Sequence, residues 1–252
     1  MSYFGKLAPC ITVAIGSLLM SAVGHAASIA FDSAATYTPG GSYNGQNGGT
    51  GFGAWNVVGT GTYSGCYLTA SDSAGSPAFQ IYVASNGDLN GYRPLTGGAL
   101  ASGQSILVTG LVLNQIADGA EAGFALTDSS NTKLIKVYAK WNDANGYYVD
   151  DATGTNRVLG VGYNLHTKLN FAFALGDTGA YTLTTTGVSS GTFVGTVGTT
   201  TGGITKFDHW AKGTSNNGEV YLESLAVTVP EPTSIALLGL ASISLLARRR
   251  RA

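Results

Sequence analysis

The middle of the chain alternates apolar and polar residues, a period of two that predicts β-strands. The clearest example covers residues 133–141. Its apolar positions, which would share a buried face, are Ile135, Val137, Ala139 and Trp141. The positions between them, which would face water, are Lys136, Tyr138 and Lys140. One buried and one wet face is typical of a strand in an antiparallel sheet.

A second strand is predicted over residues 169–175, where leucine and phenylalanine alternate with small residues. Further strands are predicted over 78–84, 105–113, 122–127, 181–186 and 219–229. Near Ser224 the apolar phase changes, which indicates a bulge or a strand buried on both faces. Asn145-Gly146 predicts a tight hairpin with two positive φ angles, and Asn90-Gly91 repeats the signal. Without a 3.6-residue period, these strands predict an all-β antiparallel sandwich or jelly roll over residues 27–229.

The N-terminal segment predicts a signal peptide over residues 1–26. An apolar run covers residues 7–23, follows a lone Lys6, and leads into small residues. Small side chains suit the pocket of signal peptidase, so cleavage is expected after Ala26 or, as second choice, after Ala27. An uncleaved anchor helix is the alternative, but a proline and a glycine interrupt the run.

The C-terminal 23 residues, 230–252, have three parts. Pro230-Glu231-Pro232 is a stiff, extended linker, because proline fixes φ and removes a backbone donor. Residues 233–247 carry no charge and predict a transmembrane helix of roughly 22 Å, short for a bilayer core of about 30 Å. A positive cluster, which would hold that end in the cytoplasm, is formed by Arg248, Arg249, Arg250 and Arg251.

This tail resembles the sorting signal of PEP-CTERM proteins, in which Pro-Glu-Pro precedes a transmembrane helix and an arginine-rich end. In that family the signal is taken to be recognised by exosortase, a membrane transpeptidase that uses a cysteine, removes the helix and transfers the protein to the cell exterior. The resemblance implies that Pro230, Glu231 and Pro232 are recognition residues of a substrate. The alternative is a plain membrane anchor with a proline spacer.

Charge and composition narrow the range of partners. Residues 27–229 hold 13 acidic and 8 basic residues, a net charge of −5 without a basic stripe, which argues against nucleic acid. One cysteine, Cys66, remains after signal removal, so no intramolecular disulfide is expected. The chain has 37 glycines and 11% charged residues, but 13 tyrosines and 9 phenylalanines favour a packed core over disorder.

Candidate chemistry in the middle is sparse. Oxygen ligands around one hairpin make calcium a candidate cofactor: Asp143, Asn145, Asp150 and Asp151. The same residue types cap ordinary turns. His166 and His209 stand apart without zinc-ligand spacing. A secreted glycosidase needs two facing carboxylates, and no predicted strand shows such a pair, so we expect no catalysis.

The stretches 41–55, 121–141 and 207–228 are similar to concanavalin-A-like or laminin-G-like sandwiches. That resemblance implies carbohydrate or matrix binding, with Trp55, Trp141 and Trp210 as candidate stacking platforms, although such rings more often fill a core. The sequence thus predicts an exported, non-catalytic protein that passes transiently through the inner membrane to the cell surface or exterior. Its role would be structural or adhesive in an exopolysaccharide or biofilm matrix, with polysaccharide binding by the sandwich or a secreted glycosidase as alternatives.

Overall fold

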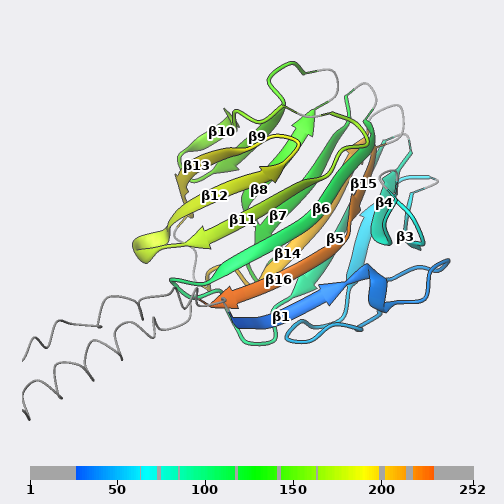
Figure 1. Cartoon of the computed structure of the whole chain (residues 1–252), viewed down its shortest axis with the longest axis horizontal. Coiled ribbons are helices and arrows are strands. Elements are labelled where there is room, and N and C mark those ends of the chain that lie inside the picture. Colours follow the sequence, from blue (N-terminus) through cyan, green and yellow to red (C-terminus); the bar gives the residue numbers. More distant parts are fainter. Residues whose placement is uncertain are drawn as a thin grey trace, which may run out of the picture. The chain divides into compact units, whose positions relative to one another are not determined.

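The computed structural model describes residues 27–229 except 63, 73–74, 85, 117–118, 141–142, 163, 199–201 and 214–217. The described residues form an antiparallel sandwich of two β-sheets, which confirms the predicted all-β class (Figure 1). The predicted signal peptide and the predicted transmembrane helix lie outside the described residues. Within the described part, no helix is long and apolar enough to span a bilayer.

The first sheet has nine strands and is built around the long strand β6 (Figure 1). Its strands are β1 (Ala27–Ser33), β3 (Gly65–Thr69), β4 (Ala78–Val83), β6 (Ser105–Ile116), β11 (Leu169–Leu175), β12 (Ala180–Gly187), β13 (Gly191–Thr196), β15 (Gly218–Leu222) and β16 (Ser224–Val229). The order is β13-β12-β11-β6-β15-β4-β3, and β16 pairs with both β6 and β1. Ala27 pairs with Val229, so the chain enters and leaves the sandwich at the same point.

The second sheet has seven strands in the order β10-β9-β8-β7-β14-β5-β2. Its strands are β2 (Asn56–Thr60), β5 (Gly87–Pro94), β7 (Glu121–Thr127), β8 (Lys133–Lys140), β9 (Tyr147–Asp151), β10 (Gly154–Val158) and β14 (Lys206–Gly213). Two short 3₁₀ turns, Ala34–Thr36 and Asp177–Gly179, complete the regular structure of the described residues. Neighbouring strands in both sheets are antiparallel, as the alternating pattern predicts.

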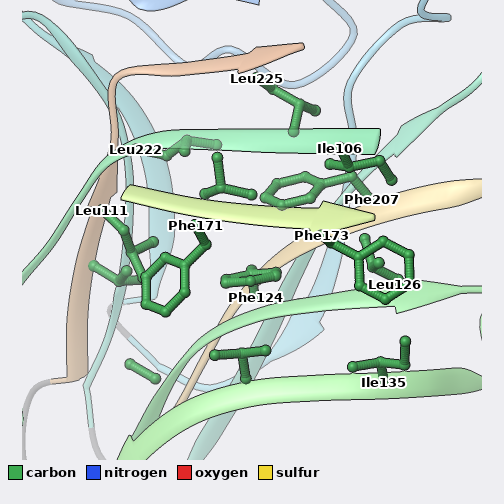
Figure 2. Packing of buried hydrophobic residues seen from close by; sticks show 14 of the residues in the cluster. Ile106, Leu111, Phe124, Leu126, Ile135, Phe171, Phe173, Phe207, Leu222 and Leu225 are labelled. Carbon is green, nitrogen blue, oxygen red and sulfur yellow. The ribbon is translucent and has the colours of Figure 1, made fainter. Parts of the chain in front are cut away.

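One hydrophobic core fills the space between the sheets. Phe171 of β11 and Phe124 of β7 meet edge to face across it, with ring centroids 5.2 Å apart (Figure 2). Phe207 of β14 stacks on the other side of Phe124 at 5.9 Å. Cys66 is buried here as a free thiol. Because apolar burial between two faces stabilises the sandwich without disulfides, residues 27–229 have the core of an independent domain.

The two clearest predicted strands are confirmed, with one difference. In β8 the predicted inner residues Ile135, Val137 and Ala139 are buried, and in β11 so are Leu169, Phe171 and Phe173. Tyr138 lies on the outer face of β8, as predicted, yet it is buried. The expected wet face of this strand is therefore covered in part by its own side chains.

The predicted strand over 219–229 is two strands, β15 and β16, which break at Glu223. Both run along β6 and flank the point where β6 changes phase at Gly110, whose φ is +65°. A Cβ at Gly110 would lie 2.3 Å from the Glu223 side chain, so glycine leaves room for that carboxylate. The apolar phase changes in both strands at this point, which explains the irregularity predicted at Ser224.

The hairpin turn between β8 and β9 differs from the prediction. Gly146 has a φ of +78°, but Asn145 is not among the described residues with positive φ. Asp143 caps the turn instead: its carbonyl accepts a hydrogen bond from the Gly146 N–H at 3.2 Å and its carboxylate one from the Asn145 N–H at 2.9 Å. Asn90-Gly91 forms no turn, because it lies inside β5.

Candidate functional site: a lysine–aromatic face

Three lysines of β8 lie on the outer face of the seven-stranded sheet, over a group of aromatic rings. We call this group, Lys133, Lys136, Lys140, Tyr138, Tyr148 and Trp210, the lysine–aromatic face. Strict alternation would place Lys133 on the same side as the buried Ile135. A register shift in the β7–β8 pairing occurs between the partners of these two residues, which brings Lys133 onto the outer face.

Each lysine ammonium of this face lies above a ring. The Lys133 Nζ is 4.1 Å from the centroid of Trp210, and the Lys136 Nζ is 4.1 Å from that of Tyr138. The Lys140 Nζ is 4.9 Å from the ring of Tyr148. These distances are within the range of cation–π attraction. Because the lysine stems cover the rings, Trp210 is only 2% exposed, and an incoming ligand meets ammonium groups before it meets aromatic carbon.

Acidic side chains hold two of these lysines in place, and the Lys140 ammonium donates a hydrogen bond to Asn156. Lys133 forms an ion pair with Asp208 at 3.2 Å. Lys136 lies between two carboxylates, 3.4 Å from Asp150 and 3.8 Å from Glu121. The arrangement fixes the ammonium groups along one strand instead of leaving them to move freely in water.

Asp208 is the buried acid of this site. Burial raises its pKa to about 6, although the nearby Lys133 ammonium acts in the opposite direction. Burial also lowers the pKa of Lys133, an effect that Asp208 partly offsets. Apart from this ion pair, Asp208 has no hydrogen-bond partner among the described residues, and neither has the Trp210 Nε1 donor. Buried polar atoms without a hydrogen-bond partner are uncommon in folded proteins.

His209, the next residue of β14, points to the opposite side of the sheet, into the interior. Burial lowers the pKa of His209 to about 3, and the backbone of Val220 offsets this only in part. Neither ring nitrogen forms a well-aligned hydrogen bond within the described part of the chain. His209 is thus a neutral interior residue and is not part of the lysine–aromatic face.

The four candidate calcium ligands separate into different hydrogen-bonded groups. Asp143 accepts hydrogen bonds from Asn145 and, at 2.6 Å, from the Tyr148 hydroxyl. Asp150 accepts one from the Tyr138 hydroxyl at 3.0 Å, and Asp151 one from the Tyr181 hydroxyl at 2.6 Å. Among the described residues, no three acidic, histidine or cysteine side chains are grouped to hold a metal. Calcium binding therefore stays a prediction, and the described residues supply no preformed cluster of ligands for it.

The candidate stacking residues have unequal positions. Trp55 lies in the core, and its Nε1 donates a hydrogen bond to Asp32 at 3.0 Å, so its ring is closed to a ligand in this structure. Trp210 belongs to the lysine–aromatic face, under two ammonium groups. Trp141, the third stacking candidate, lies outside the described residues.

The predicted sorting and cleavage residues also lie outside the described part of the chain, except Ala27, which begins β1. Those outside are Ala26, Pro230, Glu231, Pro232, Arg248, Arg249, Arg250 and Arg251.

Sequence reasoning missed Lys133 and Asp208 as neighbours. They lie 75 positions apart in sequence, on strands β8 and β14 that pair with opposite edges of β7, and the Lys133 side chain reaches Asp208 across β7. The alternation of β8 did place Lys136, Tyr138 and Lys140 on one face. The sequence of β8 alone therefore indicated part of this face, and only the pairing of strands added the contact between Lys133 and Asp208.

Comparison with known proteins assigns the tail and describes the fold of the middle. Residues 228–251 match the PEP-CTERM protein-sorting motif, which confirms the resemblance and implies an exported cell-envelope protein that exosortase sorts. No curated protein matches the sequence.

Solved structures with a similar fold include an alginate lyase from Corynebacterium sp., at 17% identity and a TM-score of 0.49, over 67% of this chain and 82% of that one. The cellulose-induced protein Cip1 matches at 11% identity and a TM-score of 0.45, over 69% of this chain and 90% of that one. A Trypanosoma rangeli sialidase matches at 13% identity and a TM-score of 0.46, over 66% of this chain but 27% of that one. At these identities and TM-scores the matches describe a likeness of fold alone and assign no activity.

Proposed function

We propose that this chain is a non-catalytic adhesive protein of the cell surface or extracellular matrix, and that its sandwich binds an anionic polysaccharide through the lysine–aromatic face. The sorting motif at residues 228–251 supports the location, because its match implies export and exosortase sorting. The arrangement of lysines over aromatic rings on one face of the sheet supports the choice of an anionic polysaccharide as the ligand. Adhesion would follow from holding a matrix polymer at the cell envelope.

The observation that carries the proposal is the concentration of lysines on one face of an acidic protein, where Glu121, Asp150 and Asp208 pair with two of them. Of the eight basic residues in 27–229, five belong to strands β8 and β14 and are outward by strand alternation or register: Lys133, Lys136, Lys140, Lys206 and Lys212. A polyuronate or sulfated chain carries repeated negative charges, so it can contact several ammonium groups at once. On binding, the lysines can exchange their present carboxylate partners for the carboxylate or sulfate groups of the polymer.

The position of one ammonium group supports a role without catalysis. Lys136 places its ammonium between Glu121 and Asp150, the acid pair that a glycosidase on this face would need. A glycosidic bond cannot occupy the same space as that ammonium. The secreted-glycosidase alternative would therefore require Lys136 to leave the site.

Removing the charges of Lys136 and Lys140 is expected to weaken retardation of residues 27–229 in a gel that contains polygalacturonate about tenfold, because each lost ammonium removes one contact with the polymer. The double variant Lys136→Gln, Lys140→Gln keeps the stems that cover the rings. Affinity electrophoresis measures the dissociation constant, and raising the salt concentration should weaken wild-type binding in parallel.

Lys168→Gln is the matched control, since Lys168 pairs with Glu223 away from this face. It should leave retardation unchanged. Equal binding by the wild type and the double variant would reject the proposed site. A flat response of the wild type to polygalacturonate and to sulfated dextran would reject polysaccharide binding and leave a structural role.

The sorted protein is expected to lose its tail. Mass spectrometry of the mature protein from native cells should show an N-terminus at Ala27 or Ser28 and no peptide from residues 233–252. Pro230→Ala together with Pro232→Ala should preserve the tail, because the stiff motif is what the sorting enzyme would read. Recovery of intact Arg251 on the mature surface protein would contradict exosortase processing.

A further inference from the structure

A pair of stacked tyrosines lies at the free edge of the nine-stranded sheet, far along the sequence from the lysine–aromatic face. Tyr67 of β3 and Tyr82 of β4 have ring centroids 5.7 Å apart and an angle of 27° between planes. Tyr67 is 45% exposed, although stacking covers one side of its ring. β3 ends the order of strands in this sheet, so a ligand can reach the pair from the side.

Gly65 is what allows the pair to form. It pairs with Tyr82 across β3 and β4. A Cβ at Gly65 would lie 2.7 Å from the Tyr82 hydroxyl oxygen and 3.0 Å from its ring. Because glycine has no side chain, the Tyr82 ring can lie over this residue and stack on Tyr67.

The two rings form part of the wall of a hollow of about 370 Å³. The other lining residues are Ser42, Asn44, Val57, Ser64, Gly65 and Cys66. The lining therefore offers hydroxyl and amide groups and, among these residues, no charged side chain. A volume of this size is within the roughly 300–1,000 Å³ of small-ligand sites.

The polar groups of the hollow are held in place by the backbone. The Asn44 Oδ1 accepts a hydrogen bond from the Val57 N–H at 2.9 Å, which fixes the plane of the amide. The Ser42 Oγ accepts one from the Asn44 N–H at 3.2 Å and lies 3.0 Å from the Cys66 Sγ. The Ser64 Oγ is buried and has no hydrogen-bond partner among the described residues. Fixed amide and hydroxyl groups beside an aromatic face are suited to a ligand with many hydroxyls.

We propose that this hollow is a second carbohydrate site, which binds one uncharged sugar ring against Tyr67. The apolar C–H face of the sugar would stack on the exposed side of the tyrosine ring, as its amphipathic surface allows. Its hydroxyls would bond with Asn44 and Ser42. The hollow lies beside β3, with Val57 contributed by β2 of the other sheet, and its lining holds no lysine, so the site is independent of the polyanion site proposed above.

Saturation-transfer NMR of residues 27–229 with the methyl glycosides of glucose, galactose, mannose and N-acetylglucosamine tests this proposal. We expect transfer to the ring protons of at least one sugar. Tyr67→Ala should weaken that binding about tenfold, whereas Tyr67→Phe, which keeps the ring, should retain it. Gly65→Ala should weaken binding as well, because both tyrosines remain but the added Cβ displaces the Tyr82 ring.

Cross-controls separate the two sites. Tyr67→Ala should leave retardation by polygalacturonate unchanged, and the Lys136→Gln, Lys140→Gln variant should leave the neutral-sugar signal unchanged. The absence of transfer to all four sugars, or equal transfer in wild type and Tyr67→Ala, would overturn the proposal. If the wild type gave a neutral-sugar signal but did not bind polygalacturonate, the proposal for the lysine–aromatic face would be rejected and the proposal for the hollow would stand.

Discussion

Replacing Asp32 with asparagine is expected to lower the free energy of unfolding of residues 27–229 by about 3–5 kcal/mol. Asp32 and Arg93 form an ion pair at 2.8 Å in which both side chains are fully buried. Loss of the carboxylate charge would leave the guanidinium in the core without a counterion. Burial already lowers the pKa of Arg93, and Asp32 is the main group that opposes this effect.

The pair also fixes the glycine-rich segment before β2. Asp32 accepts hydrogen bonds from the Trp55 Nε1 at 3.0 Å and the Tyr37 hydroxyl at 2.9 Å. Arg93 donates to the carbonyl of Gly53, and its guanidinium carbon lies 5.4 Å from the centroid of the Trp55 ring. This segment has little regular structure of its own, so the buried pair takes the place of a strand ladder in ordering it.

Equilibrium unfolding in urea at pH 7 measures the effect. Glu223→Gln is the matched control, because its ion pair with Lys168 is partly exposed and should contribute less than about 1 kcal/mol. The double variant Asp32→Asn, Arg93→Met should recover part of the loss, since it removes the unpaired charge. A cost for Asp32→Asn no larger than for Glu223→Gln would show that the pair is not essential to the fold.

Asp208→Asn is expected to make the domain more sensitive to acid between pH 6 and pH 4. The pKa of Asp208 rises from 3.8 to about 6 on folding, so its contribution to stability is full below pH 3.8 and is lost as the pH rises through 6. The pKa of His209 falls from 6.5 to about 3, so its contribution is full above pH 6.5 and is lost as the pH falls toward 3. Between pH 4 and 6 the two effects have opposite signs and largely cancel.

The difference between variant and wild type isolates each group. At about 1.4 kcal/mol per pKa unit, Asp208→Asn should lose up to about 3 kcal/mol more than wild type when the pH falls from 6 to 4. His209→Phe should change in the opposite direction and gain stability relative to wild type over the same range. Urea unfolding at half-unit pH steps measures both slopes, and parallel curves for Asp208→Asn and wild type would contradict the raised pKa.

Strand prediction worked where one face is uniformly apolar. β8 and β11 follow strict alternation, and their inner residues are buried as predicted. Strands β2, β10 and β13 are largely exposed and carry weak apolar patterns, so no signal predicted them. Strand β14 was missed for the opposite reason: five of its eight residues in succession are buried, which hides the alternation.

Residue chemistry alone could not show which side chains meet. Trp55 and Trp210 are both tryptophans in glycine-rich or strand surroundings, yet one lies in the core beside Asp32 and the other under two lysines. Asp150 and Asp151 are adjacent in sequence but bond with different tyrosines. Alternation along a strand sends neighbouring side chains to opposite faces, so a local cluster of acids need not be a cluster in space.

The sequence by itself determined the all-β class and the sorting motif, because both depend on residues close together in the chain: a period of two, and Pro-Glu-Pro followed by an uncharged run and arginines. Tertiary structure alone decided the buried Asp32–Arg93 pair, the lysine–aromatic face and the Tyr67–Tyr82 hollow. Each of these depends on strand order, on register or on the packing of one sheet against the other. Those features arise from long-range pairing, for which a single sequence carries no local signal.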